Sequence, residues 1–293
     1  MKELQWIVYI IIILWIVWFF TGGPESERAQ GGPFLKPPAP LDTGETYGEL
    51  PSLKKPSGNT SGGNVPQKES TAPSFFKDEV HIGEVASAGE SDPQAEYIEI
   101  KASSGNKNLI SLDNWVLKNS SGRSAIINKA SKLPLTGMVN VETPFFLNPG
   151  EKAIITSGRS PIGVSFQVNK CSGYLEQFQY FSPPLPADCP SPASDIYINN
   201  QSLGQTCGSY ISTLPRCEIY TAEVPSGLSA ECVSYIRNTI NYNSCVELHK
   251  NEFDFFKPEW RIYLGRNIEL WENENDLIRL YDHTGSLVDS KSY

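Results

Sequence analysis

The six cysteines of this 293-residue chain all lie in one segment, between residues 171 and 245. An even set confined to one part of an exported chain is typical of disulfide bonds. A zinc site would need close ligand pairs such as C-x₂-C, and the nearest approach is Cys245-x-x-x-His249, without a second pair. A local bridge between Cys207 and Cys217 is attractive because it would close a small loop. We therefore predict three disulfides, with fifteen possible connectivities, among Cys171, Cys189, Cys207, Cys217, Cys232 and Cys245.

Export is indicated by the N-terminus. Residues 4–20 are almost entirely apolar and follow residues 1–3, which we expect to lie in the cytoplasm. At about 1.5 Å per residue, a helix over 4–20 spans roughly 25 Å, slightly less than the hydrocarbon thickness of a bilayer. We expect a single-pass signal anchor with the rest of the chain outside the cytosol. The alternative is a secreted protein with a cleaved signal peptide, although no Ala-x-Ala-like site follows Phe20.

Residues 21–75 predict a disordered tether. They contain nine Pro and nine Gly, with Ser, Thr and Asn filling much of the rest. Such a composition cannot bury enough apolar surface to offset the entropy of ordering. As a flexible coil, the tether would have a root-mean-square reach of roughly 40 Å.

A different pattern begins near residue 76. Apolar and polar residues alternate over 80–85 and again over 96–101, as in half-buried strands. Near the C-terminus, residues 276–281 and 286–289 flank Asp282-His283-Thr284-Gly285, which predicts a hairpin. Further short strands are expected over 115–118, 124–128, 145–147 and 153–155. Such spacing predicts a mainly β fold over 76–293, an immunoglobulin-like β-sandwich.

Several of these blocks also carry a family resemblance: Ile82-x-Glu84-Val85, Glu96-Tyr97-Ile98-Glu99-Ile100, Leu112-x-x-Trp115-x-Leu117, Leu147-x-Pro149-Gly150-Glu151 and Asp276-x-Ile278-x-Leu280-x-Asp282-x-x-Gly285-x-x-Val288-Asp289-x-x-x-Tyr293. Together they resemble the lamin-tail domain over about 79–157 and 268–293. The resemblance implies an immunoglobulin-like sandwich. With an anchor and no coiled-coil rod, the chain resembles the bacterial, exported type. The family has no established catalytic residues, so the resemblance implies none here.

The chain departs from that family in a long insertion, residues 158–262, which holds all six cysteines. We expect an α-helical, disulfide-linked subdomain there. Ser229 is a good N-cap for a helix over 230–240. Ser244-x-x-Glu247 is a capping-box pattern that predicts a second helix running toward Phe256.

Sequence features that would indicate chemistry are weak. The formal net charge of −9 disfavours a nucleic-acid partner. We predict no catalytic residue, cofactor or metal ligand. We expect His81, His249 and His283 to be solvated, and Glu96 and Glu99 to point to opposite faces of one strand. The acidic stretch 272–276 could suit Ca²⁺, but it lacks an EF-hand pattern and is better explained as a polar loop.

The sequence therefore leads to the hypothesis of a membrane-anchored, cell-surface structural or binding module whose partner is a protein or cell-envelope ligand of unknown identity. Its oligomeric state stays open. The alternative is an exported hydrolase or hydrolase accessory domain, with a site around His249, Glu247 or Asp254. A set of aromatic residues in or near the insertion could form an interaction surface, or else could form the insertion's own core: Tyr174, Phe178, Tyr180, Phe181 and Trp260.

Overall fold

The computed structural model describes residues 11–12, 14–15, 70–86, 92–198, 203–272 and 275–293. The expected anchor (4–20), apart from four residues, and the tether up to residue 69 lie outside the described residues. Within the described part, no helix is long and apolar enough to cross a bilayer. The chain divides into two units, Met1–Gly63 and Asn64–Tyr293, and every strand of the described residues lies in the second.

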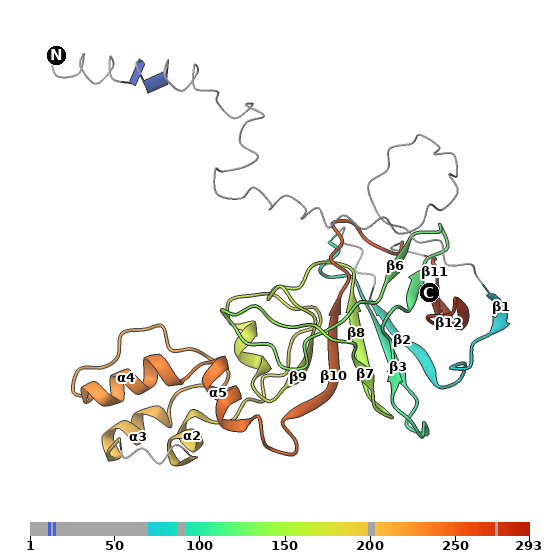
Figure 1. The fold of residues 1–293 in the computed structure, drawn as a ribbon. Helices are drawn as coiled ribbons and strands as arrows, with labels where there is room; N and C mark the ends of the chain where they lie inside the picture. The colour runs from blue at the N-terminus through green and yellow to red at the C-terminus, as the bar shows by residue number, and fades with distance from the viewer. Residues whose placement is uncertain (1–10, 13, 16–69, 87–91, 199–202, 273–274) are drawn as a thin grey trace, which may run out of the picture. The chain divides into compact units, whose positions relative to one another are not determined.

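This second unit is mostly β, with two five-stranded sheets (Figure 1). The first sheet has, in spatial order, β1 (Ser70–Pro73), β12 (Ser286–Ser292), β11 (Leu277–Tyr281), β5 (Val116–Lys118) and β6 (Ser124–Ile126). The second has β2 (Val80–Ala86), β3 (Tyr97–Ala102), β8 (Lys152–Thr156), β10 (Phe256–Tyr263) and β9 (Phe166–Asn169). A short pair joins β4 (Ile110–Ser111) to β7 (Phe146–Leu147).

The two sheets share one hydrophobic core. Ile98 and Ile100 on β3 are fully buried and belong to the same cluster as Leu117 on β5 and Leu280 on β11. The predicted alternation over 96–101 is therefore confirmed: apolar residues two apart in β3 face inward, as the period of a strand requires. The predicted hairpin around 282–285 is confirmed as well, with β11 and β12 pairing antiparallel and Gly285 at φ 82°.

The free edge of β2 is partly closed by side chains from β12. The Asp289 carboxylate accepts a hydrogen bond from the Ile82 backbone N–H at 2.7 Å, and the Lys291 ammonium group donates to the Gly83 carbonyl. The β2–β3 register shifts between Ile82 and Val85. Occupied edge groups and an irregular register both discourage pairing with another chain's strand.

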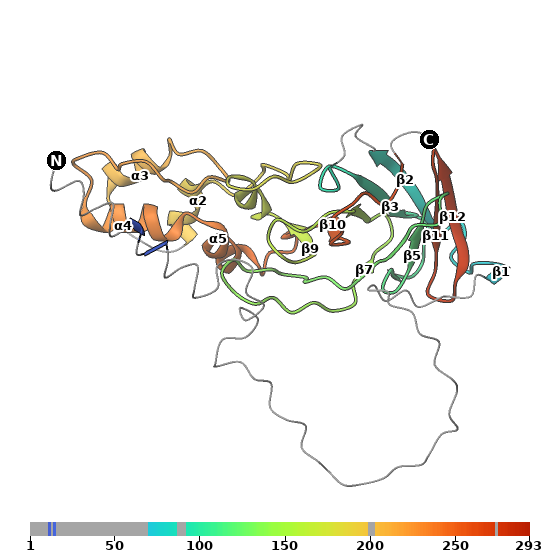
Figure 2. The ribbon, with the colours of Figure 1, turned by 90° about the horizontal axis from the view of Figure 1, so that it is seen from above.

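The insertion forms a helical subdomain beyond β9 (Figures 1 and 2). Its described residues form the 3₁₀ helix η2 (Ser172–Glu176) and four α-helices, α2 (Pro192–Ile198), α3 (Gln205–Ile211), α4 (Ala230–Thr239) and α5 (Tyr242–His249). A second hydrophobic core lies among them. The subdomain is joined to the second sheet because β9 and β10 bracket it and pair with each other. The buried Arg261 of β10 also donates hydrogen bonds to the carbonyls of Pro183 and Pro184.

Three disulfides are present, as predicted: Cys171–Cys245, Cys189–Cys217 and Cys207–Cys232. The proposed local bridge between Cys207 and Cys217 is wrong. Cys207 lies on the buried face of α3, where its sulfur meets Cys232 in the first turn of α4. Cys217 follows α3 in a left-handed conformation and pairs with Cys189 instead.

The predicted helix after Ser229 is confirmed, because α4 begins at Ala230 and the Ser229 hydroxyl accepts the Cys232 N–H at 3.2 Å. The prediction for the next helix is wrong at both ends. Asn241, not Ser244, is the N-cap of α5, and its side chain accepts the Ser244 N–H at 3.0 Å. The helix ends at His249 instead of running toward Phe256.

Candidate functional site

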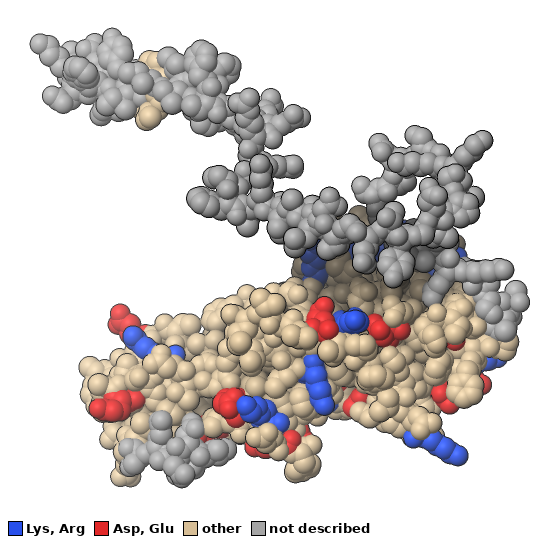
Figure 3. Space-filling model, viewed as in Figure 1, with Lys and Arg blue, Asp and Glu red and all other residues tan. Residues whose placement is uncertain are grey.

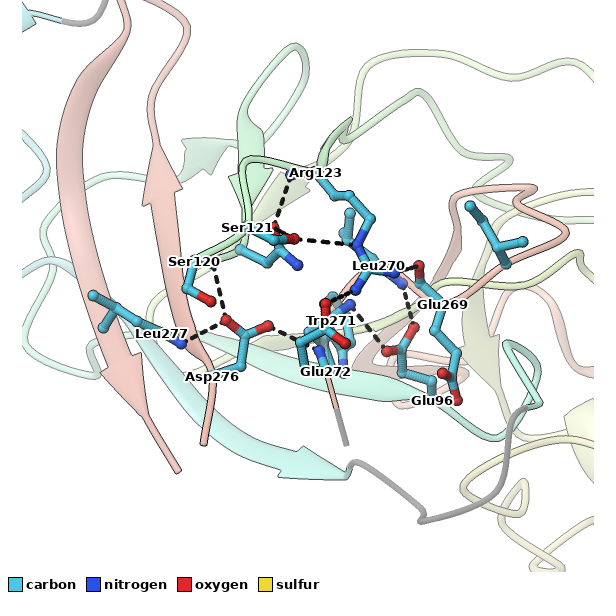
Figure 4. Close-up of polar contacts among 12 residues, drawn as sticks. Glu96, Ser120, Ser121, Arg123, Glu269, Leu270, Trp271, Glu272, Asp276 and Leu277 are labelled. Carbon is cyan, nitrogen blue, oxygen red and sulfur yellow. Dashed lines mark hydrogen bonds and ion pairs between the residues drawn. The ribbon is translucent and has the colours of Figure 1, made fainter. Parts of the chain in front are cut away.

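Glu96 is buried just before β3, and its carboxylate is used by the backbone. It accepts hydrogen bonds from the N–H groups of Leu270 at 2.8 Å and Trp271 at 3.1 Å (Figure 4). Burial raises the pKa of Glu96. The neighbouring Glu99 binds Lys152 at 2.9 Å on the other face of β3, as its position in the strand predicts. Glu96 therefore joins β3 to the 270–271 segment.

Asp276 has a similar role at the start of β11. Its carboxylate accepts from the backbone N–H groups of Ser120 at 2.9 Å, Glu272 at 2.9 Å and Leu277 at 2.7 Å (Figure 4). Burial alone would raise the pKa of Asp276, but these hydrogen bonds outweigh it and lower that pKa. The carboxylate is thus occupied by its own loop and by Ser120, which lies between β5 and β6. Over the described residues, which omit 273–274, no group of His, Cys, Asp or Glu is arranged to hold a metal ion.

Two further acidic residues of the resemblance also bind backbone. Asp282 accepts from the N–H groups of Thr284 at 2.8 Å and Ser286 at 3.1 Å, and so fixes the hairpin turn. Asp289 binds the edge of β2 through the Ile82 N–H. The acidic positions at Glu96, Asp276, Asp282 and Asp289 therefore hold the strands in register, and their arrangement is architectural.

His249 is buried, with 3% of its surface exposed, so the expectation that it is solvated is wrong. Its Nε2 lies 3.1 Å from Asp195 Oδ1 on α2, and its Nδ1 lies 2.7 Å from Glu252 Oε1. Lys170 binds the other Glu252 oxygen at 2.6 Å and also binds Asp254 at 2.6 Å. The Lys170 hydrogen bond, followed by that of His249, lowers the pKa of Glu252. His81 and His283 are exposed, as expected.

This arrangement does not bring together the residues of the hydrolase hypothesis. Glu247 is exposed and binds Lys250, and Asp254 is reached only through Lys170. A substrate could reach the His249 ring only after the surrounding chain had moved. The contact links the C-terminal end of α5 to the first turn of α2. The sequence reasoning missed Asp195, although Ser191-Pro192 with an acid in the first turn is a recognisable helix start.

The aromatic residues of the predicted interaction surface divide into two groups. Tyr174 and Phe181 are buried in the second core, and Trp260 is buried against Phe145, with ring centroids 5.0 Å apart. For these three the interaction-surface prediction is wrong, because they fill the interior. Phe178 and Tyr180 are exposed and remain available for a partner.

A second exposed apolar segment was not identified from the sequence. Met138, Val139 and Val141 are exposed, Val139 at 97% of its surface. We call residues 137–141 the apolar loop. The sequence does mark this segment, because residues 133–141 include no charged residue. The Asn140 side chain binds the Leu135 N–H at 2.8 Å and the Leu135 carbonyl at 3.1 Å.

The base of the apolar loop is also fixed to α5. The Asn243 amide accepts from the Thr136 N–H at 3.0 Å and donates to the Thr136 carbonyl at 3.0 Å. The chain just before the exposed side chains is therefore held by the side chains of Asn140 and Asn243. Exposed apolar residues that form a contiguous patch mark interaction sites, whereas singly scattered ones are ordinary.

Beside the apolar loop lies a cavity of about 170 Å³. We call it the loop cavity. None of its walls carries a charged side chain; the lining residues are Pro134, Leu135, Thr136, Gly137, Met138, Asn140, Ile162, Leu175, Gln179 and Tyr242. The Tyr242 hydroxyl donates to the Pro134 carbonyl at 2.9 Å and accepts from Asn169 at 3.1 Å. Burial raises the pKa of Tyr242 to about 12, so this hydroxyl stays neutral.

On the face that Figure 3 shows, charged side chains lie in small groups with wide uncharged areas between them. No family model matches the chain, and no curated protein matches it significantly. The apolar loop and the loop cavity together form the candidate binding surface.

Proposed function

We propose that this protein is a membrane-anchored, extracytoplasmic binding module. In this proposal residues 4–20 anchor the chain, the tether projects the folded unit, and a lamin-tail-like, immunoglobulin-like sandwich serves as scaffold. The observation that carries the proposal is the apolar loop, whose three exposed side chains stand on a backbone fixed by Asn140 and Asn243.

The location outside the cytosol is supported by the three disulfides, which suggest an oxidising compartment. The lamin-tail likeness is supported by the use of its acidic positions. Glu96, Asp276, Asp282 and Asp289 each bind backbone N–H groups, which gives a physical reason for that pattern of acids. A scaffold role needs such fixed strands and needs no catalytic group.

The size of the apolar loop sets a limit on what it can do alone. Fully burying a Val or Met side chain stabilises a complex by roughly 1.5–3 kcal/mol, so three give at most about 9 kcal/mol. Association itself costs about 4–15 kcal/mol. A stable complex therefore needs further contacts beyond the apolar loop. The loop cavity is one candidate, and exposed Phe178 and Tyr180, on either side of the cavity-lining Gln179, are others.

The proposal is tested by capturing proteins from cell-envelope extract on the immobilised full chain. The loop variant M138S/V139S/V141S is compared with Phe253→Ser, which removes an equally exposed apolar side chain outside the loop. We expect a set of proteins that the wild type and Phe253→Ser both retain and the loop variant loses. Equal capture by all three chains would contradict the proposal.

A further inference from the structure

Resting on this proposed function, we infer that the loop cavity receives one uncharged side chain, a ring or branched aliphatic group, that projects from a protein partner. The apolar loop and the loop cavity then form a single surface. The partner's projecting side chain enters the cavity while its surrounding surface covers Met138, Val139 and Val141.

The volume of the loop cavity decides between classes of occupant. Sites for small-molecule ligands and cofactors typically measure about 300–1,000 Å³. At about 170 Å³, the loop cavity is too small for most of them. It is close to an apolar cavity of about 150 Å³ in another protein that holds one benzene molecule. A single large side chain fits this space, and one anchor residue in a pocket is how many protein interfaces concentrate their affinity.

The lining explains why the occupant is uncharged. No acidic or basic side chain faces the cavity, so a charged group would lose its hydration without gaining a partner charge. Among the polar side chains of the lining, Tyr242, Asn140 and Thr136 are already hydrogen-bonded. The walls therefore offer an occupant the apolar surfaces of Leu135, Ile162 and Leu175 beside uncharged polar groups that include the amide of Gln179.

The cavity is also held open by covalent structure. Leu175 belongs to η2 and Tyr242 to α5, and the Cys171–Cys245 disulfide joins the start of η2 to the middle of α5. The third wall, the apolar loop, is attached to α5 through Asn243. A cavity whose three walls are connected in this way needs little ordering when it is filled, which favours binding.

Met138 lines the cavity and is one of only two methionines in the chain, the other being Met1. The full chain, labelled at its methionine methyl carbons and placed in lipid nanodiscs, therefore gives one NMR signal at the cavity and one reference signal. Nanodiscs are preferred to micelles because detergent could enter the cavity. The probes are N-acetyl-L-phenylalaninamide and, as the charged control, N-acetyl-L-lysinamide.

We expect the phenylalanine amide to move the Met138 signal saturably, with a dissociation constant on the order of millimolar. The lysine amide should move it at least tenfold less, and the Met1 signal should not respond to either probe. A response to both amides alike, or one that never saturates, overturns the inference. Without probe, a Met138 signal that moves with protein concentration would place a second copy of the chain in the cavity and would overturn the inference. A Met138 signal that moves with lipid composition would place lipid in the cavity and would also overturn it.

Two variants sharpen the test. Ile162→Trp fills the cavity from its half-buried wall and should abolish the saturable shift, whereas Ile126→Trp, on a partly exposed position of β6, should keep it. If Ile162→Trp does not fold, the inference is tested by the Met138 shifts that the two probes cause in the wild type and in Ile126→Trp. Loss of protein capture in the loop variant with no amide binding would refute the cavity occupant but leave the proposed binding function standing.

Discussion

Asp276 gives a sharp test of the idea that the acidic positions hold the strands. Its carboxylate accepts three backbone N–H groups, with Ser120 and Leu277 on Oδ1 and Glu272 on Oδ2. In Asp276→Ala these three partly buried N–H groups lose a charged acceptor, and a hydrogen bond to a charged group contributes about 1.5–3 kcal/mol. With partial relaxation, we expect a loss of about 3–6 kcal/mol in the free energy of unfolding.

Asp276→Asn is the milder, matched change. Its single oxygen can still accept from Ser120 and Leu277, while its NH₂ group faces the Glu272 N–H and cannot accept from it. One lost acceptor predicts a cost of about 1–3 kcal/mol. The expected order of stability is therefore wild type, then Asp276→Asn, then Asp276→Ala.

The effect should depend on pH. Because the folded protein lowers the pKa of Asp276, the unfolded chain binds more protons in acid. The stability from this carboxylate is fully present above the unfolded pKa of about 3.9 and is lost as the pH falls through the lower, folded value. The difference between wild type and Asp276→Asn should therefore shrink below about pH 4.

The assay is guanidinium unfolding of the full chain, followed by hydrogen exchange in peptides that cover β11 and β12. Exposed Asp78→Asn serves as a control for a general change in charge and should alter stability by less than about 0.5 kcal/mol. A cost for Asp276→Asn that is equal at about pH 3 and about pH 7, or a cost for Asp276→Ala no larger than that of the control, would refute the reasoning.

Three further predictions concern the helical subdomain. In the chain-entropy model, removing Cys171–Cys245, which spans 74 residues, should lower the free energy of unfolding by about 4.5 kcal/mol, and removing Cys207–Cys232, which spans 25, by about 3.5 kcal/mol. Guanidinium unfolding of the two paired Cys→Ala variants measures both costs. The reverse order would count against that account of disulfide stability. His249→Asn should destabilise by about 2–4 kcal/mol and speed hydrogen exchange in α2, because buried Asp195 loses its contact with the His249 ring. The exposed control Glu247→Gln should change neither. Equal exchange in both variants would argue that the His249–Asp195 contact is unimportant. The Lys170 hydrogen bonds lower the pKa values of Glu252 and Asp254, so Lys170→Met should raise both. A carboxyl-carbon NMR titration measures the change. Unchanged pKa values would show that these ion pairs do not form in solution.

Features set by short-range patterns could be predicted from the sequence. The alternation in β3 and the turn at Gly285 specify their local structure directly, and the Ser229 cap identifies where α4 begins. The existence of disulfides was predicted from the even cysteine count. These signals work because they act over two to four residues, where sequence distance and spatial distance agree.

Features set by long-range packing could not be predicted. The choice of Cys232 over Cys217 as partner of Cys207 depends on how α3 packs against α4, 25 residues along the chain. His249 looks like a solvated histidine until α2 brings Asp195 to it from 54 residues away. Tyr174 and Phe178 are four residues apart, yet one is buried and the other exposed. No local pattern distinguishes such pairs.

The central claim, that the apolar loop meets a partner outside the cytosol, is tested most directly in intact cells. A photo-crosslinking amino acid replaces Val139 in the full chain, and in a parallel chain it replaces Phe253, which is equally exposed but outside the loop. The account predicts a discrete covalent adduct from position 139 upon illumination and none of that mass from position 253. Adducts from position 253 alone, or the same adducts from both positions, would contradict it.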